Sequence, residues 1–217
     1  MRKTSAILAA ALLLQVPAWA DTYTFHSAPY PAAGILGFTP PCGAGACADF
    51  TAAMQQSGSF STSAPIPANF NGDISGLVTA YAFSDGLTTY ASSDPWSQLV
   101  FAVVATDATG AITGQNFALT RWQTAPPHVA NDRIDVLSLG LMSYHNDICT
   151  SVQAGVCANI LGGPSGTVSQ ALVLPGWTWS MAAGPVAAAP QSVPVDSPWA
   201  LALAAAGVLG LALRRRA

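Results

Sequence analysis

The sequence contains no glutamate and only one lysine, Lys3, among its 217 residues. Five of the seven basic residues lie at the two ends, which leaves Arg121 and Arg133 as the only arginines in between. Ten aspartates lie between Asp21 and Asp196, so this segment carries two positive against ten negative charges, a formal −8, whereas the whole chain carries −3. Such an acidic segment argues against nucleic acid and anionic lipid as partners, because both are polyanions.

The lack of glutamate and lysine also removes two of the best helix formers. Glycine, serine, threonine, asparagine, aspartate and proline are frequent instead, and this composition favours strands joined by turns. Roughly 175 residues between the two ends suffice for one domain with a hydrophobic core. The sequence therefore predicts an all-β fold, a single antiparallel β-sandwich-like domain over residues 21–183.

Short runs of alternating or continuous apolar residues, bounded by turn residues, mark the expected strands. They are Thr22–His26, Gly58–Ser63, Ile74–Ser84, Leu87–Tyr90, Gln98–Thr106, Ile112–Thr124, Arg133–Leu141, Thr167–Leu174 and Trp177–Met181. Within one of them, alternation places Phe117, Leu119 and Arg121 on the same face. The segments Pro29–Ala48 and Cys149–Cys157 are expected to be loops.

The N-terminus has the pattern of a secretory signal peptide. A short basic start precedes an apolar stretch from Ile7 to Val16. Ala18 and Ala20 form a small-x-small cleavage site, so Asp21 is expected to be the first residue of the mature chain. The alternative, a permanent N-terminal anchor, is disfavoured because the stretch is short and ends in a cleavage site. Residues 1–20 therefore predict export through the Sec translocon and removal by signal peptidase.

The C-terminus carries a second apolar stretch followed by a basic end. The 15 residues from Trp199 to Leu213 would form roughly 22 Å of helix, short against a bilayer core of about 30 Å. Arg214, Arg215 and Arg216 follow as a basic stop on the cytoplasmic side. The alternatives are an ordinary tail anchor and an amphipathic terminal helix, and the second lacks a polar face between Ala200 and Leu213. A short transmembrane helix that serves as a temporary anchor is expected.

A proline-containing motif precedes this stretch. Its residues are Val193, Pro194, Val195, Asp196, Ser197, Pro198 and Trp199. Motif, apolar span and arginine cluster together resemble the PEP-CTERM and IPTL-CTERM class of C-terminal sorting signals, and the spacing from Pro194 to Trp199 is closer to the IPTL type. The Pro-Glu-Pro triplet is absent, and Pro198 stands where the IPTL pattern has glutamate.

The resemblance implies that an exosortase-type membrane transpeptidase recognises the motif, cuts near it and passes the protein to the cell surface. Residues 193–217 are then a sorting signal, joined to the β domain by an Ala/Pro linker over residues 184–192. The expected location is the cell surface or the extracellular space, after transient anchoring in the inner membrane.

The four cysteines form two close pairs in the sequence, Cys42 with Cys47 and Cys149 with Cys157. Export would bring them into an oxidising compartment, where disulfides form. Four cysteines allow three connectivities, and the short spacings favour the two local bridges. A metal site or free thiols are the alternatives, and no histidine lies at zinc-finger spacing from either pair.

No catalytic constellation is visible in the sequence. The run Gly162–Gly166 misses the spacing of a serine nucleophile elbow. His26, His128 and His145 are scattered, and each is expected to be a surface or packing residue rather than a general base. The sequence therefore predicts that the protein is not an enzyme.

Calcium is the one cofactor for which ligand types occur at a suitable spacing. Asn69, Asn71 and Asp73 place side-chain oxygens at alternate positions, as in calcium loops, but the downstream bidentate glutamate is absent. A second small cluster consists of Asn131, Asp132 and Asp135. Both stretches are also typical of simple turns. The expectation is no cofactor, with calcium as a weak candidate.

Three functional hypotheses follow. The first is a non-enzymatic cell-surface or extracellular-matrix protein processed at its sorting signal. The second is a carbohydrate-binding or adhesive module for extracellular polysaccharide, in which Trp177 and Trp179 would present an exposed stacking face; core packing of these rings is favoured over exposure, because aromatic residues are common in strands. The third is a secreted hydrolase, which requires a cleft with converging polar groups.

Overall fold

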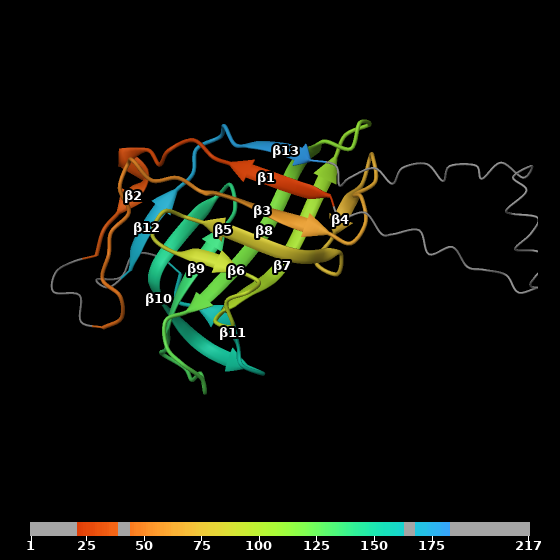
Figure 1. Ribbon diagram of the computed structural model, residues 1–217. Coiled ribbons are helices and arrows are strands. Elements are labelled where there is room, and N and C mark those ends of the chain that lie inside the picture. Colours follow the sequence, from red (N-terminus) through yellow and green to blue (C-terminus); the bar gives the residue numbers. More distant parts are fainter. Residues whose placement is uncertain (1–20, 39–43, 163–167, 183–217) are drawn as a thin grey trace, which may run out of the picture. The chain divides into compact units, whose positions relative to one another are not determined.

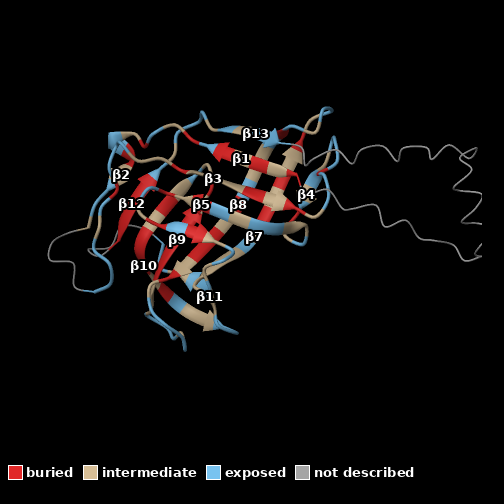
Figure 2. Cartoon of the chain, viewed as in Figure 1, coloured by how far each residue is buried: buried red, intermediate tan, exposed pale blue. Residues whose placement is uncertain are grey.

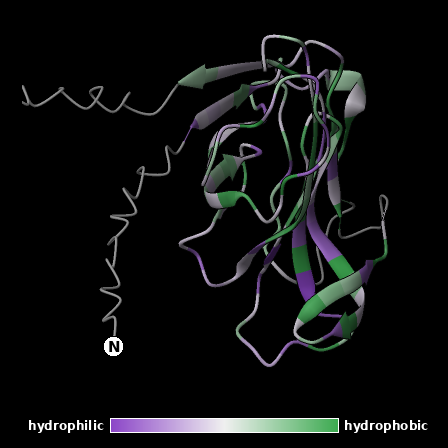
Figure 3. Cartoon of the chain, turned by 90° about the vertical axis from the view of Figure 1, so that its right-hand side faces the viewer, coloured by the Kyte–Doolittle hydropathy of each residue, from purple (hydrophilic) through white to green (hydrophobic). Residues whose placement is uncertain are grey.

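Alternating polar and apolar residues build an all-β domain whose strands all pair antiparallel. The computed structural model (Figure 1) describes residues 21–38, 44–162 and 168–182, which belong to one unit within Met1–Gly184. Figure 3 shows hydrophobic and hydrophilic residues following one another along the long strands. The prediction of an all-β fold with antiparallel sheets is confirmed.

The strands form two sheets. The smaller sheet has the order β13 (Thr178–Ala182), β1 (Thr22–His26), β3 (Ser57–Thr62), β5 (Val78–Ser84) and β6 (Thr89–Ala91). The larger sheet has the order β2 (Ile35–Leu36), β12 (Ser169–Leu172), β10 (Met142–Gln153), β9 (Arg133–Ser138), β8 (Ile112–Trp122), β7 (Ser97–Thr106) and β4 (Asn71–Asp73), and β11 (Val156–Ile160) pairs with β10. A short 3₁₀ turn, η1 (Ala32–Gly34), precedes β2.

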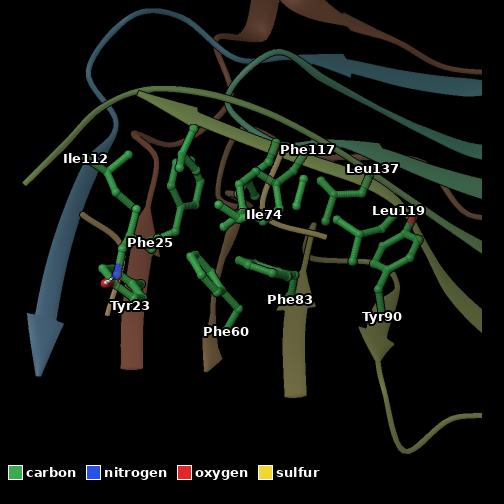
Figure 4. Packing of buried hydrophobic residues seen from close by; sticks show 14 residues of the cluster. Tyr23, Phe25, Phe60, Ile74, Phe83, Tyr90, Ile112, Phe117, Leu119 and Leu137 are labelled. Carbon is green, nitrogen blue, oxygen red and sulfur yellow. Dashed lines mark hydrogen bonds between the residues drawn. The ribbon is translucent and has the colours of Figure 1, made fainter. Parts of the chain in front are cut away.

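The main hydrophobic core lies between the two sheets. Figure 4 shows its side chains pointing toward one another from strands of both. The small sheet contributes Tyr23, Phe25, Phe60, Phe83 and Tyr90, and the large sheet contributes Ala102, Val104, Phe117, Leu119 and Leu137. Burial of each large apolar side chain contributes about 1.5–3 kcal/mol. The aromatic rings of the small sheet therefore supply much of the energy that holds the sheets together.

The outer face of the large sheet carries a second buried cluster. Trp122, Ile134, Val136 and Cys149 form it, and Cys157 and Ile160 of β11 pack against it. Because β9 is covered on both faces, four of its six residues are buried. Figure 2 shows how buried residues are distributed along the strands of the domain.

The first and last strands of the domain are neighbours in the small sheet. Thr22 of β1 lies opposite Ala182 of β13, and Phe25 lies opposite Trp179. The residue before β1, Asp21, is buried, and its carbonyl accepts the Thr62 amide N–H at 3.1 Å. The expected first residue of the mature chain is therefore part of the folded domain.

Three expectations about elements are wrong. The segment Pro29–Ala48, expected to be a loop, contains η1 and β2, and β2 pairs with β12. The segment Cys149–Cys157 is a β-hairpin, because β10 continues to Gln153 and turns through Ala154 and Gly155, both with positive φ, into β11. The single strand expected over Ile74–Ser84 is also wrong. The Ile74 amide bonds to Ala102 of β7, and β5 begins only at Val78.

Candidate functional site

The inner face of the large sheet changes from apolar to polar beside β6. Phe117 and Leu119 belong to the core, and alternation places Arg121 next on the same face. Leu119 pairs with Leu137, and Arg121 pairs with Asp135 in the same register. Since β6 is the edge strand of the small sheet, this polar end lies at the edge of the apolar interface, and the predicted placement of Arg121 is confirmed.

A pocket of about 570 Å³ opens at this place. Its polar lining consists of Thr88, Thr89, Asp94, Arg121, Gln123, Asp135 and His145. Ala46, Leu87 and Ala91 complete the wall. The volume falls within the range of small-molecule sites, about 300–1,000 Å³.

Arg121 and Asp94 form an ion pair in this wall. Arg121 Nε donates to Asp94 Oδ2 at 2.7 Å, and both side chains are about one-quarter exposed, 29% and 25%. Asp94 is held in place by the Trp96 amide at 3.0 Å and by Ser97 Oγ at 3.0 Å. The guanidinium also lies 5.6 Å from the centre of the Trp96 ring. Slight burial raises the pKa of Asp94, but these bonds outweigh it and hold that pKa below its usual value.

Asp135 is the centre of a buried network under the pocket. Its Oδ2 accepts from Thr88 Oγ1 at 2.9 Å. Its Oδ1 accepts from Gln123 Nε2 at 2.6 Å and from the backbone N–H of Asn146 at 2.9 Å. His145 Nδ1 lies 3.0 Å from the same Oδ1. Burial acts to raise the pKa of Asp135, but the His145 pairing and the other bonds lower it. The carboxylate is therefore fixed and charged.

A β-bulge supplies two of these contacts. Tyr144 pairs with Val136 and Asp147 pairs with Ile134, so His145 and Asn146 together face the single residue Asp135. Asn146 adopts φ 64°, in the left-handed region that asparagine tolerates. The bulge aims both the His145 ring and the Asn146 amide at Asp135, and bulges often re-aim side chains in this way.

His145 is almost completely buried, with 5% of its surface exposed. Burial acts to lower its pKa, but the hydrogen bond and charge of Asp135 and the charge of Asp85 outweigh this and raise it. The Ala46 carbonyl adds a small contribution in the same direction. His145 Nε2 itself is buried and has no hydrogen-bond partner among the described residues.

A second buried carboxylate, Asp85, adjoins the network through Thr88. Asp85 Oδ1 accepts from the amides of Leu87 and Thr88, and Oδ2 accepts from Tyr90 Oη at 3.0 Å. Burial raises the pKa of Asp85 to about 6, and the three bonds only partly offset it. Burial likewise raises the pKa of Tyr30, whose hydroxyl donates to the Asp85 carbonyl.

This arrangement differs from a nucleophile triad. Thr88 Oγ1 lies 3.4 Å from His145 Nδ1, the nitrogen that also faces Asp135. In a triad, the base contacts its nucleophile and its carboxylate through different ring nitrogens. Thr88 also donates to Asp135. These three residues therefore form a rigid floor of the pocket, and the Thr88 hydroxyl is not placed as an activated nucleophile.

The other two histidines lie away from the pocket. His26 is exposed at the end of β1. The His128 ring stacks on Trp122 at 4.1 Å with nearly parallel planes. The expectation of surface or packing roles describes these two residues, whereas His145 also belongs to a buried ion pair that the sequence pattern does not indicate.

The residues of the two calcium candidates lie on different elements. Asn71 and Asp73 lie exposed on β4, and Asp73 Oδ1 accepts both the amide and the hydroxyl of Ser75. Asp135 is turned into the buried network, whereas Asp132 Oδ2 accepts the Val129 amide in a loop. Within residues 21–38, 44–162 and 168–182, no group of three or more His, Cys, Asp or Glu side chains could hold a metal ion.

The structure contains one of the two expected disulfides among its described residues. Cys149 and Cys157 are joined, with their Cα atoms 5.7 Å apart, which confirms that local pairing. Cys42 lies outside the described residues, so its pairing with Cys47 stays a prediction.

Trp177 and Trp179 belong to the periphery of the core. Both are half-buried and pack against its aromatic residues. Trp179 contacts the rings of Phe25, Phe60 and Phe117, and its indole N–H donates to Gln115 Oε1. Both rings pack against the core, which agrees with the favoured expectation of core packing over an exposed stacking face.

The segments on which the expected localisation depends lie outside the described residues. They are the signal peptide with Ala18 and Ala20, the motif Val193–Trp199, the span Ala200–Leu213 and the stop Arg214–Arg216. In the part of the chain that is described, no helix reaches the length and hydropathy that crossing a membrane requires.

No family model matches this chain, and no curated protein or solved structure matches it either. The sequence pattern does not indicate the Arg121–Asp94 pair or the network around Asp135. One signal is present, since Arg121 continues the alternation of the apolar Phe117 and Leu119 in a segment with only two arginines.

Proposed function

We propose that this chain is an exported cell-surface or extracellular-matrix protein, without enzymatic activity of its own, that an exosortase-type transpeptidase processes at its C-terminal signal. The observation that carries the proposal is the Cys149–Cys157 bridge, which ties β10 to β11. Disulfides persist in oxidising compartments and are rare in the cytosol. The bridge therefore supports the export that residues 1–20 predict.

The pairing of β1 with β13 agrees with a precursor held at both ends. Asp21 follows the predicted signal peptide directly, and the next residue, Thr22, lies opposite Ala182, after which the chain continues toward the sorting signal. Both connections therefore leave from the same end of the small sheet. A domain of this kind can fold while both flanking segments are still attached to one membrane.

The intact mass of the protein recovered from the cell surface or medium tests this proposal. We expect a chain that begins at Asp21 and ends within or near Pro194–Trp199. A chain that begins at Asp21 and runs to Ala217 would instead indicate a permanent anchor, and the sorting proposal would be withdrawn. Retention of residues 1–20 would contradict export by signal peptidase.

The pocket favours a second candidate function, a carbohydrate-binding or adhesive module built on a β-sandwich. Paired guanidinium and carboxylate groups, fixed by neighbours and open to solvent, suit recognition of hydroxyl-rich ligands. The candidate site is thus the pocket at Arg121 rather than the face of Trp177 and Trp179. Binding of the full-length chain to an array of extracellular polysaccharides tests this function. Absence of binding to every polysaccharide on the array would contradict it.

A further inference from the structure

The Arg121–Asp94 pair has unused hydrogen-bonding capacity on both partners. Asp94 Oδ2 accepts from Arg121 Nε and Ser97 Oγ, but within the described part of the chain Oδ1 accepts only the Trp96 backbone N–H. Arg121 donates through Nε alone, and among the described residues its two terminal nitrogens make no hydrogen bond. A carboxylate can accept about four hydrogen bonds, and a guanidinium has five N–H donors. The pair therefore presents an acceptor and several donors side by side.

The surrounding side chains hold this pair in one geometry. Trp96 contributes its amide to Asp94 and its ring to the guanidinium. Arg121 lies on β8 within the large sheet, and the turn that carries Asp94 is closed by the bond from the Ser97 amide to the Asp94 carbonyl at 3.0 Å. Preorganisation of this kind lowers the entropic cost of binding a ligand.

The floor of the pocket offers little further binding capacity. Gln123 donates to Asp135 through Nε2 and accepts the Ala46 amide through Oε1 at 2.9 Å. Thr88 donates to Asp135, and His145 Nε2 is buried. Only Thr89, whose side chain is exposed and makes no hydrogen bond among the described residues, adds a hydroxyl at the rim. Ligand recognition is therefore concentrated on Arg121, Asp94 and Thr89.

Charge balance narrows the class of ligand. The exposed part of the pocket holds one positive and one negative group in contact, so it offers no net charge to an ion. The segment from Asp21 to Asp196 carries a formal −8, which disfavours anionic ligands. A cation would need a carboxylate without a partner, and Asp94 and Asp135 are both paired. A neutral ligand with several hydroxyl groups fits these conditions.

We infer that the pocket binds a neutral sugar ring and that the Arg121–Asp94 pair recognises two adjacent hydroxyl groups of it. One hydroxyl donates to Asp94 Oδ1, and the oxygen of its neighbour accepts from a terminal nitrogen of Arg121. The two hydroxyls must be adjacent because the two protein groups are in contact. This inference rests on the proposed carbohydrate-binding function and adds its location and specificity.

NMR titration of the full-length ¹⁵N-labelled chain in detergent micelles tests the inference. The probes are methyl α-mannoside, methyl β-galactoside and methyl β-glucoside, each with analogues that lack one ring hydroxyl. We expect saturable shifts of the Arg121 Nε–H and the Trp96 indole N–H with at least one glycoside. Loss of either recognised hydroxyl should weaken binding by about tenfold, since one partner then lacks its hydrogen bond. Glucuronate and glucosamine should bind more weakly than the neutral glucoside.

Two variants locate the site. Arg121→Gln and Asp94→Asn should each weaken binding by about tenfold. Arg133→Gln removes the same charge outside this pocket and is the matched control, with an expected change below about twofold. Thermal unfolding establishes that each variant is folded, and the shift map of the unsubstituted chain locates the site even if one variant is not.

The outcomes separate this inference from the function on which it rests. Glycoside binding that is unchanged in Arg121→Gln and Asp94→Asn would overturn the site and leave carbohydrate binding in place. Equal binding of all the deoxy analogues would overturn the adjacent-hydroxyl rule. Tighter binding of glucuronate than of the neutral glucoside would overturn the inference that the ligand is a neutral sugar. Polysaccharide binding on the array without binding of any monosaccharide probe would overturn the pocket as a sugar-ring site.

Discussion

His145 Nδ1 lies 3.0 Å from Asp135 Oδ1, across a β-bulge where two residues of β10 face one residue of β9. Both side chains are more than nine-tenths buried. Removal of one partner of a buried ion pair costs about 3–5 kcal/mol, because the other charge loses its compensation. The pair is therefore a sensitive point of the domain.

Asp135→Asn should lower the free energy of unfolding by about 3 kcal/mol. Asparagine keeps one acceptor oxygen, but it cannot accept the bonds from His145, Thr88, Gln123 and the Asn146 amide together. Urea unfolding of the two proteins measures the difference. Asp73→Asn, on an exposed strand, is the matched control and should change stability little. A loss below about 1 kcal/mol in Asp135→Asn would show that the network does not stabilise the fold.

Asp85 should make the domain less stable as the pH rises from about 4 to about 6. Its pKa is raised by burial from 3.8 to about 6, so the folded state binds a proton more tightly than the unfolded state in this interval. Stability then falls with rising pH, by roughly 3 kcal/mol for a difference of about two pKa units. Asp85→Asn should remove this part of the slope in unfolding measured between about pH 3.5 and 7. An unchanged slope would contradict the burial of an ionisable carboxylate at this position.

His145 should add a second loss of stability at higher pH. Its pKa is raised in the folded state, so its stabilising contribution is complete below the unfolded value of 6.5 and is lost as the pH rises through the folded pKa. Asp135 has a lowered pKa, so its contribution is present above 3.8 and is lost as the pH falls through its folded pKa. In His145→Gln the loss above pH 6.5 should disappear. Persistence of the same loss in this variant would assign it to another group.

The sequence predicts the fold class because period-two alternation and turn residues are local signals. Alternation predicts Thr22–His26 at its observed bounds, and the placement of Arg121 beside Leu119 follows from alternation alone. The strand β10 escapes prediction because its bulge at His145 and Asn146 shifts the period by one residue. An asparagine within such a strand resembles a loop residue when it is seen only in sequence, since asparagine is typical of turns.

The candidate site could not be predicted from the sequence. Its two ion pairs join residues that are 27 and 10 positions apart, Asp94 with Arg121 and Asp135 with His145, and only strand pairing brings them together. Spacing rules for catalytic and metal sites do not identify them, because the groups come from different strands and loops. For Trp179 the sequence favours core packing over exposure but does not decide between them. Alternation shows which residues share a face of a strand but not which face is covered.

Loss of the Cys149–Cys157 bridge should destabilise the domain moderately. The bridge closes a short loop with a sequence separation of 8, for which loop-closure entropy gives about 2.5 kcal/mol. The double variant Cys149→Ala/Cys157→Ala should show this loss in urea unfolding. A reducing agent should cause the same loss of stability in the unsubstituted protein. In the variant, which lacks this bridge, reduction should cause no such loss through it. Equal stability of both proteins under oxidising conditions would contradict a stabilising role.

Replacement of Arg214, Arg215 and Arg216 by glutamine should impair retention and processing of the precursor. In the proposed sorting function, the 15-residue stretch before them is a short span rich in alanine and glycine, and its orientation depends on the basic cluster that follows. Pulse labelling with immunoprecipitation should show less mature protein at the surface and more unprocessed chain, while Arg133→Gln, which removes a basic residue from the β domain, is processed normally. Normal processing of the triple variant would remove the topological argument and leave the motif Val193–Trp199 as the sole recognised signal.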